Sequence, residues 1–439
     1  MSNPSPASDA VPFSALVNKD FITPRFGPGE RVDPFWGMVW PNSDGGPVLA
    51  WRSLESEQAL ADAGIRVTSR PSGRRHTRTQ DEAISLLNKR RSRLITLGAI
   101  NLWRTVTGEQ LAAITGQSGL ASPTSDVTGL LFDGGLIQRS RAQYAGRALD
   151  TMPEVFRPAP QAGKMDLRQH LRFKDWMGVT LGTPPLQGHQ YDRHNLLATE
   201  LSLRAAEICP IRSVLGESAA GWPRLFDSKM RPNPHRSADA VWIREDGLKI
   251  ALELTNAVTP ATVTKIEQLA ELLARDTSRS VVFLFVVAAQ PRDERTSDVA
   301  KRLRQAIKKS SHSSRSRILG EVEKRLTIAR WESWFPAKGL VSRDFIPLRA
   351  QRYVAAEDDW VDTDLLDPYS SPFDGAGSYA LEETSRNLND VYGVPHWMRT
   401  GPGFDFDALL IEKAGFGKVL EIRAASNRDR SQRAIIQQK

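Results

Sequence analysis

Apolar residues at helical spacing predict three helices early in the chain. The first covers 81–102, where leucine and isoleucine form a stripe among basic residues. The second opens with the capping box Thr-Gly-Glu-Gln at 107–110 and ends at Gly116. The third starts near Pro123, where a helix loses nothing from the missing N–H of proline, and runs to about Phe132.

A β-hairpin is predicted after the three helices. Its first strand starts at 136–137, its turn lies near 145–146, and its second strand passes through 155–156. This order is that of a winged helix-turn-helix, which puts its third helix in the DNA major groove and its hairpin on the backbone. Docking of a protein partner is the alternative use of such a unit. The predicted DNA contacts are hydroxyls of the third helix and arginines of the wing: Ser122, Thr124, Thr128, Arg139, Arg141 and Arg147.

Two apolar strands further along the chain flank a turn at 245–247. If Glu-Asp-Gly forms a three-residue loop there, Arg244 pairs with Leu248, and the same register places Asp239 opposite Glu253 on one face. The Cβ atoms of such neighbours lie about 4.5–5.5 Å apart. Two carboxylates this close repel, so the pair implies a divalent cation or a raised pKa. A two-residue loop would shift the register by one and separate the acids.

The elements around this second hairpin complete an α/β core. An amphipathic helix over 262–275 carries Lys265, and the apolar run 281–287 predicts a strand buried on both faces. Upstream, a helix over 193–208 has Glu200 among its polar positions. The expected fold class is therefore a multidomain α+β and α/β protein. A winged helix-turn-helix is followed by a restriction-endonuclease-like domain of the PD-(D/E)xK type and a C-terminal extension.

In the PD-(D/E)xK fold, an Asp and a Glu bind Mg²⁺, and a Lys two residues after the Glu orients the attacking water. The metal polarises the phosphate and lowers the pKa of bound water. Asp239 and Glu253 stand at the acid positions, and Thr255 stands where that Lys is usual. Lys265 on the next helix is placed to replace it, so we expect Mg²⁺ at the two acids. The competing interpretation is a solvated strand Glu and an ordinary surface Lys.

From 82 to 290 the chain resembles the replication-relaxation family of plasmid and mobile-element proteins. The resemblance rests on the order of the winged helix, a Pro/Gly joint, His194-Asn195, Ala-Asp239-Ala, Glu253-x-Thr255 and Lys265. It implies a DNA-binding protein of plasmid replication, relaxation or transfer. It also implies Asp239 and Glu253 as core acids, Lys265 as the helical lysine and Glu200 as an acid from the helix.

The net charge of +8 on 439 residues is concentrated in two basic windows. Residues 301–330 carry ten Lys or Arg against two Glu, and residues 70–104 carry nine against two acids. An acidic stretch after 355 offsets the surplus. Such windows are typical of a polyanion-binding protein, although solvated helix faces would give the same counts. The residues expected at DNA from 301–330 are Lys301, Arg304, Lys308 and Lys309.

Several classes of protein are excluded by what the sequence lacks. The single Cys209 excludes an internal disulfide and a Cys-based zinc cluster. There is no P-loop, and His170, His189 and His194 match no metal-ligand spacing, so we interpret them as structural. No apolar run reaches the roughly 18 residues of a membrane span, and the N-terminus lacks the pattern of a signal peptide. We therefore expect a cytoplasmic protein with no membrane partner.

These signals divide the chain into an N-terminal arm, the winged helix, a linker, the nuclease-like domain and the extension, at 1–80, 81–157, 158–190, 191–335 and 336–439. The expected function is a DNA-binding protein of a plasmid or mobile element, with duplex DNA as its partner. Its nuclease-like domain is either non-catalytic or a Mg²⁺-dependent endonuclease. From another class, an assembly protein whose winged helix binds a protein stays open, as does a homo-oligomer.

Overall fold

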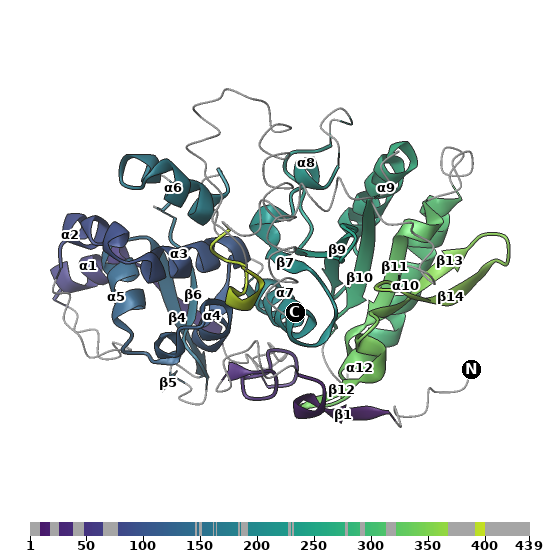
Figure 1. Ribbon diagram of the computed structural model, residues 1–439, viewed down its shortest axis with the longest axis horizontal. Helices are drawn as coiled ribbons and strands as arrows, with labels where there is room; N and C mark the ends of the chain where they lie inside the picture. The colour runs from purple at the N-terminus through teal and green to yellow at the C-terminus, as the bar shows by residue number, and fades with distance from the viewer. Residues whose placement is uncertain are drawn as a thin grey trace, which may run out of the picture.

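The computed structural model is a mixed α/β protein (Figure 1). It describes residues 9–17, 26–37, 48–64, 78–144, 147–148, 152–160, 162–163, 165–182, 185, 192–226, 230, 232–276, 280–289, 295–312, 322–367 and 391–399. The two larger sheets, each with its own helices, occupy the left and right of Figure 1. Across the described residues, no helix has the length and apolarity needed to cross a membrane.

The smaller of these two sheets belongs to a unit of helices and a hairpin. Its elements are β2 (Val48–Arg52), α1 (Leu54–Asp62), α2 (Gln80–Ser85), α3 (Arg91–Trp103), β3 (Val106–Thr107), α4 (Gly108–Thr115), α5 (Asp126–Asp133), β4 (Ile137–Tyr144), β5 (Arg147–Ala148) and β6 (Val155–Pro158). The sheet order is β2-β4-β6-β3, and every pairing is antiparallel. Three helices, α3 to α5, thus precede the hairpin of β4 and β6, as the apolar pattern predicts.

Local sequence explains the helix boundaries of this unit and corrects two of them. The predicted single helix over 81–102 is wrong: Arg90 is extended, with φ −145° and ψ 120°, and separates α2 from α3. The capping box of Thr107 and Gln110 is confirmed, and α4 ends at the left-handed Gly116, with φ 74°. The third helix begins later than Pro123, because a 3-10 turn precedes it and α5 starts at Asp126.

The larger sheet has seven strands in the order β14-β13-β11-β10-β9-β8-β7. The strands β9, β10 and β11 are parallel, and the remaining pairs are antiparallel. The strands β13 and β14 lie after residue 336, so the expected C-terminal extension contributes to this sheet. Its elements are α7 (Asp192–Ile208), β7 (Ser213–Gly216), β8 (Ala240–Ile243), β9 (Lys249–Thr255), α9 (Pro260–Arg275), β10 (Val281–Val287), α10 (Arg295–Ser311), β11 (Leu326–Arg330), β13 (Arg349–Val354) and β14 (Asp359–Asp364).

Helices cover both faces of this sheet. On one face, Trp242 of β8 donates its indole N–H to the Ser202 hydroxyl of α7, at 2.9 Å. Successive residues of a strand point to opposite faces, so Glu253 points away from the face of its neighbour Leu252. On that second face, Lys265 of α9 contacts Glu253. The strand β10 lies in the middle and is buried along its whole length, as its apolar run predicts.

The two units meet along a seam that includes the ends of α3 and β7. A Cβ atom at Gly216 would overlap the carbonyl oxygen of Leu102, so the backbones approach too closely for any larger residue. Buried apolar residues of both units form one continuous core. Further short elements are β1 (Ala10–Pro12), α6 (Phe173–Thr180), α8 (Trp222–Leu225), α12 (Trp331–Trp334) and β12 (Leu340–Ser342).

Candidate functional site

The hairpin of β8 and β9 has the register that brings its two acids together. Arg244 N donates to Leu248 O at 2.9 Å, and Gly247 closes the turn with φ 92°. The strand pairs run from Ile243 opposite Lys249 to Ala240 opposite Leu252. The predicted three-residue loop is therefore confirmed, and its register holds as far as Ala240. Asp239 lies just beyond this last pair, and its backbone N–H donates to Leu252 O at 2.9 Å, so Asp239 approaches Glu253 from the end of the ladder and not as a strand pair.

Asp239 lies just before β8 and is held by two donors. Its Oδ2 accepts the backbone N–H of Leu254 at 2.6 Å and lies 2.9 Å from Nε2 of His194. The side chains of Asp239 and His194 are 17% and 20% exposed, so this end of the cluster is reached by solvent. His194 comes from the first turn of α7, 45 residues before the acid.

Glu253 lies on β9 and is the more buried acid, with 6% of its side chain exposed. Lys265 Nζ donates to Glu253 Oε2 at 2.6 Å and to Ser237 O at 3.0 Å. Thr259 caps the first turn of α9, with Pro260 at its first position, and this fixes where Lys265 enters. Glu253 Oε1 is buried and has no hydrogen-bond partner among the described residues.

The four charges perturb one another's pKa values. Burial raises the pKa of Glu253 to about 7; the charge of Asp239 adds to the rise and Lys265 opposes it. Burial also acts to raise the pKa of Asp239, but His194, Lys265 and the Leu254 N–H outweigh it, and the pKa falls. The pKa of His194 is raised, because Asp239 outweighs burial. Glu253 is thus the acid whose charge is least stabilised.

Glu217 and Arg104 border this cluster and were not predicted from the sequence. Ser237 Oγ donates to Glu217 Oε1 at 3.3 Å, and Arg104 Nε lies 3.9 Å from Glu217 Oε2. Burial raises the pKa of Glu217, and the charge of Asp239 adds to the rise. The signal was its place directly after β7, whose last residue pairs with the first residue of β8.

A guanidinium group also lies at the carboxyl ends of β9 and β10. The amide nitrogen of Asn256 donates to Ala288 O at 2.8 Å, and its oxygen accepts from Arg193 Nη1 at 2.9 Å. Burial lowers the pKa of Arg193 to about 9. Arg193 precedes His194 in the chain, so the start of α7 brings two basic side chains to this edge of the sheet.

Glu200, expected at the same centre, lies in another cluster. It is 1% exposed and accepts hydrogen bonds from Arg31, Gln110 and Arg204. Arg31 also contacts both carboxylate oxygens of Glu207, at 2.6 and 2.8 Å. Glu200 follows His194 by six residues on one helix, which separates them by about 9 Å along the axis and about 120° around it.

The predicted DNA contacts of the first unit divide by exposure. Ser122 and Thr124 are exposed before α5, but Thr128 is fully buried. Arg139 is 6% exposed and binds the carboxylate of Glu154 at 2.7 and 2.8 Å, so it cannot also reach DNA without breaking that pair. Arg141 is partly buried. The side chain of Arg147 lies outside the described residues, although its backbone forms β5.

The predicted contacts on α10 also divide. Lys301 and Lys309 are exposed, and Lys308 forms an ion pair with Asp358 of 2.6 Å. Arg304 is partly buried, with its guanidinium carbon 5.7 Å from the ring centre of Trp360. Exposed cations of this helix are therefore fewer than its sequence suggests.

Within the described part of the chain, no group of three or more His, Cys, Asp or Glu side chains could hold a metal ion. A two-carboxylate site, as expected from the sequence, is a smaller set. Comparisons with protein-family models, with curated proteins and with solved structures find no match to this chain.

Proposed function

We propose that this protein binds DNA and hydrolyses a DNA phosphodiester bond with Mg²⁺ at the cluster of Asp239, Glu253 and Lys265. The observation that carries the proposal is the unpartnered Glu253 Oε1 beside a second carboxylate. A buried acceptor without a donor costs about 1–3 kcal/mol, and a cation bound at Oε1 would remove that cost. An oxygen left open in this way is suited to a ligand that brings positive charge.

The donor set suits Mg²⁺. This ion prefers oxygen ligands and is commonly held by one or two carboxylates together with water and substrate phosphate oxygens. Asp239 and Glu253 supply two carboxylates, so no third side chain is required. Mg²⁺ held there would supply Lewis-acid polarisation of the phosphate and a lowered pKa for bound water.

Lys265 and His194 complete the site. A lysine ammonium has three N–H donors, and Lys265 uses two of them on Glu253 and Ser237. The third N–H of Lys265 can donate to a phosphate oxygen or to the attacking water. This is the role of the Lys that the PD-(D/E)xK fold usually has at the position of Thr255. His194 holds the carboxylate of Asp239 in place through Nε2 and acts as a positioning residue.

The first unit supports the DNA-binding half of the proposal. Its helices and hairpin follow the order of a winged helix, with exposed Ser122 and Thr124 before α5. The sequence resemblance points to plasmid or mobile-element DNA as the partner. Since several wing and helix cations are paired internally, affinity is expected to be moderate. Sequence specificity is expected to be weak, because Ser122 and Thr124 offer few contacts to base edges.

The proposal is tested by incubating supercoiled plasmid with the full chain and Mg²⁺ or Mn²⁺. Wild type should nick or linearise the plasmid, and EDTA should prevent it. Asp239→Asn and Lys265→Met should each lower the rate at least about 100-fold, because each removes a group needed at the phosphate. Glu271→Gln is the matched control, since it neutralises an exposed acid of α9 outside the cluster and should leave the rate unchanged.

Cleavage that persists in Asp239→Asn would refute the proposed centre. Binding is measured separately, by the salt dependence of duplex affinity. For a protein that contacts phosphates, log K falls against log[salt] with a slope of about −0.9 per phosphate. Salt-dependent binding without cleavage would mean that the protein binds DNA and that its nuclease-like domain is non-catalytic. A log K that does not change with log[salt] would exclude DNA as the partner.

A further inference from the structure

Arg304 on α10 is held in a fixed place although it pairs with no carboxylate in the described part of the chain. Its Nη2 donates to Oε1 of Gln351 on β13. Its guanidinium lies over the Trp360 ring at 5.7 Å, and its Nε is buried without a partner. Contacts to an amide and an aromatic ring orient the side chain but leave its charge uncompensated.

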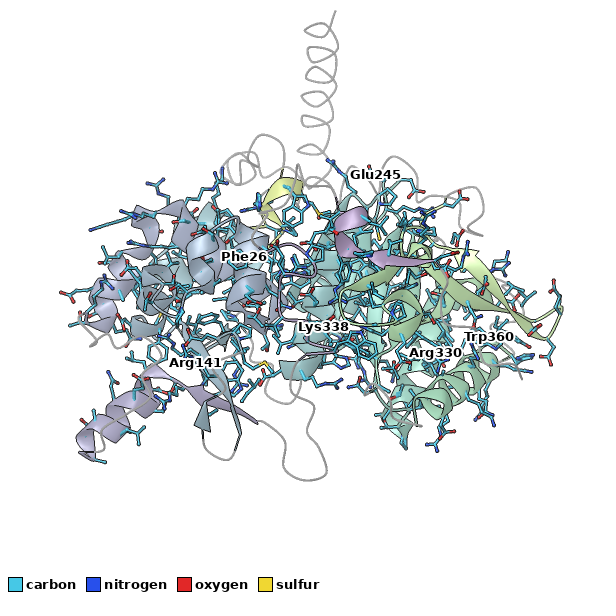
Figure 2. All side chains as sticks on the ribbon, turned by 90° about the horizontal axis from the view of Figure 1, so that it is seen from below. Phe26, Arg141, Glu245, Arg330, Lys338 and Trp360 are labelled. Carbon is cyan, nitrogen blue, oxygen red and sulfur yellow. The ribbon has the colours of Figure 1, made fainter. Side chains whose placement is uncertain are left out.

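Arg330, the last residue of β11, lies beside Arg304. Gln351 pairs with Ile328 across β11 and β13, and Arg330 is two residues further along the same face. Ile328 and Arg330 are therefore about 7 Å apart along β11. Figure 2 shows Arg330 and Trp360 at the same end of the molecule, and Arg141 at the other end. The Arg330 Nε is also buried without a partner among the described residues.

The other cations of α10 show that this arrangement is not general. Arg302 pairs with Asp298 at 2.7 Å, and Lys308 pairs with Asp358 at 2.6 Å. Arg304 lacks such a carboxylate, and its pKa is lowered by burial and by the charge of Arg330. Two guanidinium groups brought together repel, and an anion between them would remove the repulsion.

We propose that Arg304 and Arg330 together bind one phosphate group of a nucleic-acid backbone. Arginine is suited to this ligand, because its planar N–H groups match the oxygens of a phosphate in pairs. Gln351 and Trp360 hold the clamp in place before binding. This inference rests on the proposed DNA binding, and it names Arg330, which lies at the carboxyl edge of the same parallel strands as the acid cluster.

The test measures duplex DNA affinity of the full chain against salt concentration for Arg304→Gln, Arg330→Gln and the double variant. Arg302→Gln is the matched control, with the same charge change on the same helix. If both arginines hold one phosphate, each single variant lowers the salt slope by about 0.9, and the double variant lowers it by no more than that. Arg302→Gln should leave the slope nearly unchanged.

A slope unchanged in Arg304→Gln and Arg330→Gln, or changed equally by Arg302→Gln, would overturn the clamp while DNA binding stands. A double variant that loses twice the slope would overturn the shared phosphate. Inorganic pyrophosphate provides a second test that does not need DNA. If the clamp binds it, the melting temperature of the protein should rise. If wild type binds no DNA, a rise that Arg330→Gln abolishes supports the clamp for free phosphates, and no rise refutes it.

Discussion

Helix α7 carries two charge clusters that differ in how completely their charges are satisfied. Toward the middle and end of the helix, Glu200 and Glu207 are enclosed with Arg31 and Arg204. At its start, His194 joins the cluster of Asp239, Glu253 and Lys265. Both clusters combine acids and bases near a sheet, so composition alone does not distinguish them.

The cluster of Glu200 is closed. Both oxygens of Glu200 and both oxygens of Glu207 accept hydrogen bonds from arginine, and Arg204 also binds Asp33 at 2.8 Å. The side chains of Glu200, Arg31 and Arg204 are each 1% exposed. Arg204 Nη1 is buried without a partner in the described part of the chain, but every oxygen of Glu200 and Glu207 is occupied, so this cluster leaves no carboxylate oxygen for a cation. It fastens the segment 26–37 to the body.

The cluster of Asp239 is open. Glu253 Oε1 lacks a partner in the described part of the chain, and His194, Asp239 and Lys265 remain 17–20% exposed. The two clusters hold similar numbers of charges, and the proposed cation site differs from the structural cluster in having a carboxylate oxygen near solvent that no donor occupies. Four predictions follow from this difference, from the largest expected effect to the smallest.

The largest effect is expected from breaking the closed cluster at Arg31. Arg31→Met leaves Glu200 and Glu207 buried without their shared cation, and removing one partner of a buried pair costs about 3–5 kcal/mol. Urea unfolding should show this loss in the free energy of unfolding. Lys265→Met is the comparison in the open cluster, and its loss should be clearly smaller. Equal losses would mean that the two clusters have the same structural role.

Acid should weaken the closed cluster through Glu200. Its folded pKa is lowered to about 2 from 4.5: burial opposes this shift, and Arg31 and Arg204 outweigh burial. A lowered carboxyl pKa stabilises the fold above pH 4.5, and this stability is lost as pH falls toward 2, to a total of about 3 kcal/mol.

The pKa of Glu207 is raised by burial, so its contribution changes in the opposite direction. Glu200→Gln isolates the effect of Glu200. The stability difference between wild type and this variant should narrow on acidification. A difference independent of pH would contradict the assignment.

The seam beside the open cluster should tolerate no side chain at Gly216. Gly216→Ala would push the new Cβ against Leu102 O and the Trp103 ring, and such overpacking costs about 1–3 kcal/mol. Thermal unfolding should show the loss. Gly119→Ala is the control, because its Cβ would meet open space and its φ is not left-handed. A loss at Gly216 no larger than at Gly119 would show that the seam can separate.

The smallest effect on stability is expected inside the open cluster. Glu253→Gln keeps the shape of the side chain. Burial raises the pKa of Glu253 to about 7, so its charge adds little to stability at neutral pH, and the partly exposed Lys265 keeps its bond to Ser237 O. The free energy of unfolding should therefore fall by less than about 1 kcal/mol. The same variant should lose stabilisation by Mg²⁺, which for wild type amounts to about 1.4 kcal/mol at ten times the dissociation constant. A variant still stabilised by Mg²⁺ would place the ion elsewhere.

Short-range features of the structure could be predicted from the sequence. The hairpin register follows from a three-residue turn with Gly247, and the start of α4 follows from the capping box at Thr107. Both depend on contacts between residues close in the chain. The approach of the two acids is therefore largely predictable, since the turn sets the register as far as Ala240, the residue next to Asp239.

Contacts between distant segments could not be predicted. Glu200 has the helical position of a catalytic acid, but its role is decided by Arg31, which lies 169 residues away in sequence. Arg139 has the position of a wing contact, but Glu154 already binds it. The spacing of His194 from the other histidines matches no metal-ligand pattern, so the sequence predicts a structural histidine and gives no sign of its contact with Asp239. Only the fold determines which partner each charge finds.

The central claim is that one of the two clusters is open to a divalent cation. Electron paramagnetic resonance of Mn²⁺ mixed with the full chain tests it directly. Wild type should bind one Mn²⁺ per chain in competition with Mg²⁺, Asp239→Asn should bind none, and the control Asp358→Asn should bind as wild type does. No bound Mn²⁺ in wild type, or equal binding in Asp239→Asn, would contradict the claim.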